Sequence, residues 1–122
     1  MGVVKTLRLI LALAFCLATT LPAAEPATFL HVVTVKWRAD STAQQQQAAI
    51  DGVRKMSTEI KGIRNIWIKK VKVQPADYDL TFAMEFESKA AFDAYTTSDA
   101  HKAWEKVYLP IREESHTQDI TN

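Results

Sequence analysis

The chain has 122 residues, enough for one domain, and a formal net charge of +1 at neutral pH. A nearly balanced charge does not supply the basic surface that nucleic acids require, so nucleic-acid binding is excluded as a main role. The sequence contains one cysteine, which excludes an intramolecular disulfide and a zinc site built on several thiolates.

The first 24 residues are typical of a secretory signal peptide. Lys5 and Arg8 give a basic start, residues 9–17 form an apolar run, and small residues follow at Ala23 and Ala24. The apolar run is short for a membrane span. We therefore expect cleavage after Ala23 or Ala24, and an uncleaved N-terminal anchor is the alternative.

Cleavage would leave one domain, residues 25–122. The formal charge would change from +1 to −1, and Cys16 would be lost with the leader. This interpretation predicts export to the periplasm or the extracellular space, with no stable membrane insertion of the remaining domain.

The first predicted strand spans residues 28–37, TFLHVVTVKW, which are rich in β-branched and aromatic side chains. Both faces are largely apolar, which predicts a strand covered on both sides. His31 is the polar exception on its face.

A helix is predicted from Ala43 to about Ile60. Thr42 with Gln45, or Ser41 with Gln44, fits a capping box at its start. Gly62 is predicted to be the C′ residue that ends it.

Residues 64–73, RNIWIKKVKV, are predicted to form a second strand. Lys69, Lys70 and Lys72 favour an edge position, because charged side chains protect an exposed sheet edge. A basic binding patch is the alternative interpretation of these lysines.

The alternating segment from Tyr78 to Phe86 predicts a third strand. Two short helices should follow: one over residues 89–95 that starts after Ser88, and one from Ala100 to about Tyr108 that is capped by Ser98 or Asp99. His101, Trp104, Tyr108 and Ile111 lie on one face of the second helix. Residues 115–121 form a plausible last strand.

The order strand, helix, strand, strand, helix, strand is that of a ferredoxin-like α+β fold with an antiparallel sheet. Helices would cover one face of this sheet. The strands carry apolar residues on both sides, so the other face must also be covered. A second copy of the chain is the simplest way to cover it. We therefore expect a homodimer with two-fold symmetry, which would form a dimeric α+β barrel.

Several segments in this order resemble the stress-responsive A/B barrel (Dabb) family. They are the strand around His31, the segment YDLTFAMEFES, the A-Y-x5-H pattern that ends at His101, Lys61-Gly62-Ile63, and Asp119-Ile120. The resemblance covers about residues 28–120 and implies a dimeric α+β barrel. Many members read Y-x2-H-P-x-H at the helix junction, where this chain keeps the Tyr and the last His but lacks the first His and the Pro.

The resemblance also suggests a reaction. Plant polyketide cyclases similar to this family use a His and a Tyr at the positions of His101 and Tyr95, with another His at the position of His31. Carried over, His101 would be a general base, Tyr95 would hold a substrate carbonyl, and His31 would be a donor in the pocket wall. The alternative is that Tyr95 and His101 only fix the helix junction.

The remaining candidates are apolar. Together with His31, four aromatic residues are candidate binding residues: Trp37, Trp67, Phe82 and Trp104. We expect no cofactor and no metal, because the three histidines form neither a His-x3-His nor a His-Glu-x-x-His pair. The leading prediction is an exported stress-responsive barrel protein that binds a small apolar molecule. The alternatives are a cofactor-free, polyketide-cyclase-like lyase and, third, a monooxygenase-like barrel.

Overall fold

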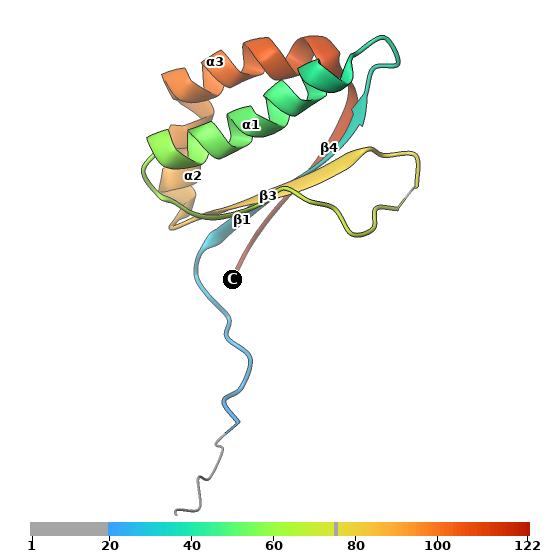
Figure 1. Ribbon diagram of the computed structural model, residues 1–122. Coiled ribbons are helices and arrows are strands. Elements are labelled where there is room, and N and C mark those ends of the chain that lie inside the picture. Colours follow the sequence, from blue (N-terminus) through green and yellow to red (C-terminus); the bar gives the residue numbers. More distant parts are fainter. Residues whose placement is uncertain (1–19, 75) are drawn as a thin grey trace, which may run out of the picture.

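The computed structural model describes residues 20–74 and 76–122. Residues 1–19 of the predicted signal peptide, with Cys16, lie outside the described residues. The elements in chain order are β1 Phe29–Trp37, α1 Ala43–Glu59, β2 Ile63–Trp67, β3 Leu80–Phe86, α2 Lys89–Thr97, α3 Asp99–Tyr108, the 3-10 turn η1 Leu109–Ile111, and β4 Arg112–Thr121 (Figure 1).

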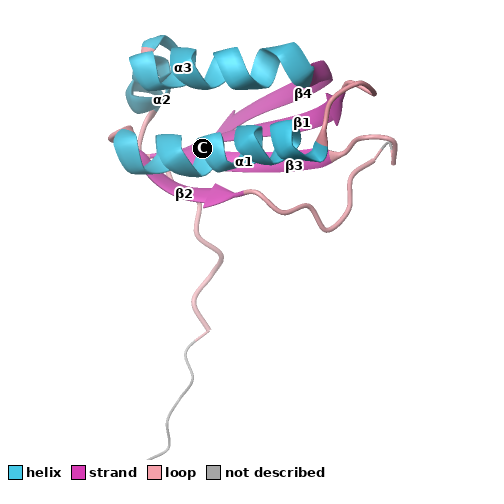
Figure 2. Ribbon diagram, turned by 45° about the horizontal axis from the view of Figure 1, so that its top comes forward, coloured by secondary structure: helices cyan, strands magenta, loops and turns pink. Residues whose placement is uncertain are grey.

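The strands form one antiparallel sheet in the order β2-β3-β1-β4. The helices lie together on one face of this sheet, with α1 and α3 side by side along it (Figures 1 and 2). The predicted ferredoxin-like α+β fold is therefore confirmed.

The core lies between the sheet and the helices. Along β1 and β3 every second side chain is buried, because successive residues of a strand point to opposite faces. These side chains meet buried residues of the helices and of η1: Ala49, Val53, Met56, Tyr95, Trp104, Tyr108 and Ile111.

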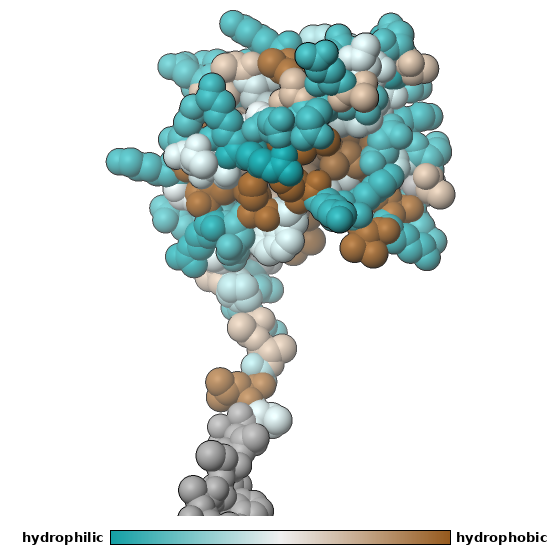
Figure 3. All heavy atoms as spheres, viewed as in Figure 1, coloured by the Kyte–Doolittle hydropathy of each residue, from teal (hydrophilic) through white to brown (hydrophobic). Residues whose placement is uncertain are grey.

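The other face of the sheet has no helix over it in the described part of the chain. Val32 and Thr34 of β1 point to this face and are only partly buried. Trp67 of β2 lies opposite Ala83, on the same face, with 53% of its surface exposed. Figure 3, viewed as Figure 1, shows brown hydrophobic residues at the surface among teal hydrophilic ones. The uncovered face of the sheet thus carries apolar side chains among polar ones.

The predicted capping box at the start of α1 is confirmed. The Gln45 amide donates to Thr42 Oγ1 at 3.1 Å, and the Thr42 amide donates to Gln45 Oε1 at 2.9 Å. At the other end the prediction is wrong by one position. Ile60 is the C-cap, so Gly62 lies two residues beyond it and not one. Gly62 has a φ of 92°, in the left-handed region that favours glycine.

The second strand is shorter than predicted, because β2 ends at Trp67 and not at residue 73. Lys70 and Lys72 continue the period-2 pattern beyond Trp67, but their side chains offer little apolar surface that a strand could bury. Beyond Trp67 the chain leaves the sheet, and Lys70 Nζ donates to the carbonyl of Tyr78 at 2.8 Å in the loop that leads to β3. The last strand is longer than predicted and begins at Arg112.

Within residues 20–74 and 76–122, no helix combines the length and the apolar character needed to cross a bilayer.

Candidate functional site

Ser98 joins α2 to α3 and thereby positions two candidate residues. Its hydroxyl accepts a hydrogen bond from the His101 amide at 3.1 Å and donates to the Tyr95 carbonyl at 2.8 Å. One residue therefore caps the start of α3 and the end of α2. This short junction holds the Tyr95 and His101 rings with their centroids 4.5 Å apart.

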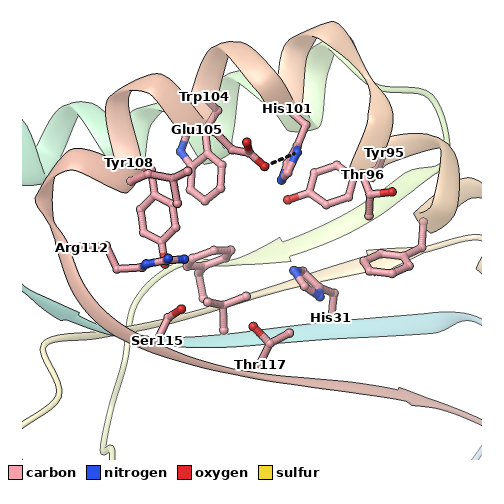
Figure 4. Close-up of a pocket in the computed structure, with 14 residues that line it drawn as sticks. His31, Tyr95, Thr96, His101, Trp104, Glu105, Tyr108, Arg112, Ser115 and Thr117 are labelled. Carbon is pink, nitrogen blue, oxygen red and sulfur yellow. Dashed lines mark ion pairs between the residues drawn. The ribbon is translucent and has the colours of Figure 1, made fainter.

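A cavity of about 230 Å³ lies between α2, α3 and the sheet (Figure 4). Its lining combines aromatic side chains with polar groups. The lining residues are His31, Val33, Phe82, Phe92, Tyr95, Thr96, His101, Trp104, Glu105, Tyr108, Leu109, Arg112, Ser115 and Thr117.

His31 reaches the cavity from the middle of β1. Only 9% of its surface is exposed, and its Nδ1 lies 2.6 Å from Oδ1 of Asp119, which is its cross-strand partner on β4. A carboxylate can only accept, so we assign the ring proton to Nδ1. In this tautomer the other ring nitrogen, Nε2, keeps its lone pair and can accept a hydrogen bond.

His101 faces His31 across the cavity, from the first turn of α3. Its Nδ1 lies 3.1 Å from Oε1 of Glu105, one turn further along the helix (Figure 4). The angle does not suit a hydrogen bond, so this buried nitrogen has no hydrogen-bonding partner among the described residues.

The environment keeps His101 neutral near pH 7. Burial lowers its pKa, and His31 acts in the same direction, while Glu105 and the backbone of Thr96 partly oppose them. A neutral imidazole is the form that can remove a proton.

Tyr95 lies beside both histidines, with 2% of its surface exposed and its ring centroid 6.0 Å from that of His31. Its hydroxyl points toward the centre of the cavity (Figure 4). Burial raises the pKa of Tyr95, so the phenol keeps its proton at neutral pH and can donate it in a hydrogen bond.

The other end of the cavity carries Tyr108 from α3 and Arg112 from the start of β4. Tyr108 is 4% exposed, and its hydroxyl is buried without a hydrogen-bonding partner in the described part of the chain. Burial raises the pKa of Tyr108, whereas the adjacent Ser115 and Arg112 lower it. These two residues are thus close to the hydroxyl but do not complete a hydrogen bond with it.

The structure brings five of the predicted site residues together: His31, Phe82, Tyr95, His101 and Trp104. Trp37 lies on the same side of the sheet but behind Tyr108, in edge contact at 6.1 Å, and does not line the cavity. Trp67 faces the uncovered side of the sheet. The cavity therefore has one tryptophan in its wall and not three.

Sequence reasoning gave no site role to four polar residues of this region: Glu105, Tyr108, Arg112 and Asp119. A signal existed for Glu105, which follows His101 by four residues and so lies on the same helix face. Tyr108 lies on the predicted apolar face of α3. Asp119 and Arg112 depend on how β4 pairs with β1, which no local pattern reveals.

Among the residues that the structure describes, no three His, Cys, Asp or Glu side chains are placed to hold a metal ion.

The architecture defines a ferredoxin-like α+β domain with a polar-and-aromatic cavity between its helices and its sheet. Residues 29–122 match the stress-responsive A/B barrel domain, and the chain belongs to this Dabb family. No curated protein matches the chain.

Solved structures with the same fold share little sequence with this chain. A Dabb family protein from Mesorhizobium loti is 21% identical with a TM-score of 0.67, over 78% of this chain and 96% of that chain. A dimeric protein of unknown function from Bacteroides fragilis is 17% identical with a TM-score of 0.65, over 81% and 100% of the two chains. A hydroxynitrile lyase from Passiflora edulis is 13% identical with a TM-score of 0.69, over 78% and 93%.

Proposed function

We propose that this Dabb protein binds a small, mostly apolar molecule that carries a carbonyl or similar polar group. One observation carries the proposal: Tyr95 and two histidines from different elements direct polar groups into a cavity whose other walls include Phe82 and Trp104.

The first test is to purify the protein under native conditions and to identify bound small molecules by mass spectrometry. The wild-type protein should retain a compound that His101→Ala and Tyr95→Phe lose. His116→Ala is the matched control, because His116 is exposed on β4 and lies outside the cavity lining. Equal ligand content in all four proteins would contradict binding at this site.

A second candidate function is acid–base catalysis of the kind a cofactor-free lyase performs. The observation that favours it is the pairing of a partly buried, neutral His101 with the protonated Tyr95 at 4.5 Å between ring centroids. Tyr95 would hydrogen-bond a substrate carbonyl while His101 removes a proton from the adjacent carbon. The lyase from Passiflora edulis supports this candidate only in that it shares the fold.

Proton exchange tests this candidate without knowledge of the natural substrate. In deuterated buffer, the wild-type protein should accelerate exchange of the protons next to the carbonyl of 4-phenyl-2-butanone, as followed by NMR. His101→Gln should reduce the acceleration by about a hundredfold, the lower end of the usual contribution of a general base. Exchange at the wild-type rate in His101→Gln would remove His101 from this role.

We also infer that two copies of the chain pack their uncovered sheet faces together. The partly buried Val32, the exposed Trp67 and the description of similar structures as dimeric support this homodimer.

Export of the protein remains part of the proposal because of the predicted signal peptide over residues 1–24. N-terminal sequencing of protein from the culture medium or periplasm should begin at Ala24 or Glu25, and an intact leader there would contradict cleavage.

A further inference from the structure

The cavity has two chemically different ends. His31, Tyr95 and His101 form one end, where imidazole lone pairs and a phenol meet. The other end is formed by Tyr108, Arg112 and Ser115 (Figure 4). The polar groups assigned to the ligand in the proposed function all lie at the first end.

The second end is built by the register of β4. Arg112 lies opposite Trp37, and Ser115 and Thr117 lie opposite Val35 and Val33, so their side chains share the helix-covered side of the sheet. All the residues that β4 gives to the cavity lining are polar. β4 is also an edge strand, so this wall has no further strand beside it in the described chain.

Tyr108 presents a buried donor at this end. Its ring is fixed by stacking on Trp104, with centroids 4.3 Å apart and planes 11° apart, and by the edge of Trp37. The hydroxyl is therefore held in place, buried and without a hydrogen-bonding partner in the described residues. Ser115 and Arg112 lie close to this hydroxyl without completing a hydrogen bond, so the phenol can still donate to an acceptor that enters the cavity.

Arg112 presents a positive charge beside that donor. Its guanidinium carbon lies 5.5 Å from the centre of the Tyr108 ring, and the side chain extends into the cavity below Tyr108 (Figure 4). Its contacts with the ring and the hydroxyl of Tyr108 aside, the Arg112 side chain is joined to no other described residue by an ion pair or a hydrogen bond. The nearest acidic lining residue, Glu105, is directed instead toward His101.

We propose that Arg112 and the Tyr108 hydroxyl bind the carboxylate of a small organic acid, whose apolar part extends along the cavity toward His101 and Tyr95. A guanidinium offers a planar pair of donors that matches two carboxylate oxygens, and the phenol adds a third donor. A neutral carbonyl could accept from Tyr108 but would leave Arg112 uncompensated. The inference rests on the proposed function, since it names the class of molecule that occupies the same cavity.

The test compares 3-phenylpropanoate with its neutral analogue of nearly the same shape, 3-phenylpropanamide. Both are titrated into the purified protein at pH 7.5 by isothermal calorimetry, and NMR shifts of Tyr95 and His101 report occupancy of the cavity. The carboxylate should bind about tenfold more tightly than the amide, the effect of one charge-assisted hydrogen-bonding pair.

Four variants separate charge, geometry and fold. Arg112→Met should weaken carboxylate binding about tenfold and leave amide binding unchanged, and Arg112→Lys should recover part of the loss. Tyr108→Phe should weaken carboxylate binding severalfold and provides a second variant if Arg112→Met does not fold. Lys106→Met is the matched control, because it removes the same charge from the exposed side of α3 and should leave both affinities unchanged.

The possible outcomes distinguish this inference from the proposed function. If both compounds bind equally, shift Tyr95 and His101, and are unaffected by Arg112→Met, the cavity binds small molecules and the carboxylate assignment is wrong. If neither compound binds at millimolar concentration, the carboxylate assignment and the proposed binding function both fail.

Discussion

Asp119 controls which nitrogen of His31 can act in the cavity. It accepts from Nδ1 at 2.6 Å across the β1–β4 pair and leaves Nε2 as the free acceptor. Such a partner orients an imidazole and selects its tautomer. In the proposed site, Asp119 would therefore be a positioning residue that acts through His31.

Asp119→Ala removes this acceptor. We expect the His31 ring to populate both tautomers, which ¹⁵N chemical shifts of the imidazole would show, and stability to fall by about 1 kcal/mol for the lost hydrogen bond. Gln118→Ala changes the adjacent residue, which lies opposite Val32 on the other face, and should leave the tautomer unchanged. A single Nδ1–H tautomer in Asp119→Ala would show that Asp119 does not select it.

Burial of His101 also predicts a pH dependence of stability. Its pKa in the folded protein lies below the ordinary value of 6.5, so between the two values the unfolded chain binds more protons than the folded one. Stability should therefore rise with pH through that interval. Below the lowered pKa the full cost of burying this side chain is present, and above 6.5 it is absent.

His101→Gln removes the titrating group while keeping a polar side chain. Its free energy of unfolding should fall less than that of the wild type when the pH is lowered from 7.5 to 5, as measured by urea denaturation. Lys102→Gln, on the exposed side of α3, should retain the wild-type dependence. If His101→Gln shows the wild-type slope, His101 does not contribute to the pH dependence.

At the scale of elements, the α2–α3 junction depends on one hydroxyl. Ser98 accepts from His101 N and donates to Tyr95 O, whereas Ser88 caps only the start of α2 by accepting from Ala91 N at 3.1 Å. The two serines are thus similar caps that differ in their connection to the cavity.

Ser98→Ala and Ser88→Ala should each cost about 1 kcal/mol of stability, the usual value for an N-cap. Only Ser98→Ala should also loosen the Tyr95–His101 geometry and reduce the amount of ligand retained in native mass spectrometry. Equal ligand retention by the two variants, at equal loss of stability, would show that Ser98 does not position the cavity residues.

The elements that could be predicted from sequence are those in which one local pattern dominates. β1, α1 and β3 were predicted to within two residues, because their apolar periodicity and caps agree with their burial. β2 was predicted too long, because Lys70 and Lys72 keep a period of two outside the sheet. A strand pattern defines alternation but not where pairing with a neighbour ends.

Residues of the candidate site could be predicted only where the resemblance to the Dabb family or the apolar face of α3 indicated them. His31, Tyr95 and His101 were identified in this way. Arg112 and Asp119 were not, because their places in and beside the cavity follow from the pairing of strands that are distant in sequence. Trp67 was predicted to line the cavity because the sequence shows that it is aromatic. The sequence does not show which face of the edge strand β2 carries its side chain, and in the structure this is the uncovered face.

At the scale of the whole molecule, a monomer leaves apolar side chains such as Val32 and Trp67 on a sheet face that no described helix covers. A domain of this size buries a small core, so an additional interface contributes substantially to its stability. Val32 lies near the centre of this face, with Ala83 and Gln118 opposite it on the neighbouring strands.

Val32→Glu places a charge in the proposed interface and should convert the dimer to a monomer in sedimentation experiments, with lower stability. Val107→Glu is the matched control, because Val107 is 44% exposed on α3, away from the sheet. A wild-type protein that sediments as a monomer at micromolar concentration would contradict the proposed dimer.

The central position of β1 also determines when the protein can fold. Its partners β3 and β4 come late in the chain, and Phe29 lies opposite Thr121. Contacts of such long sequence separation form slowly, because much chain entropy must be lost first. During synthesis, β1 can pair with β4 only after residues 112–121 have left the ribosome. The same residues bring Arg112 to the cavity and Asp119 to His31, so the cavity acquires these two contributions only when the last strand has paired with β1.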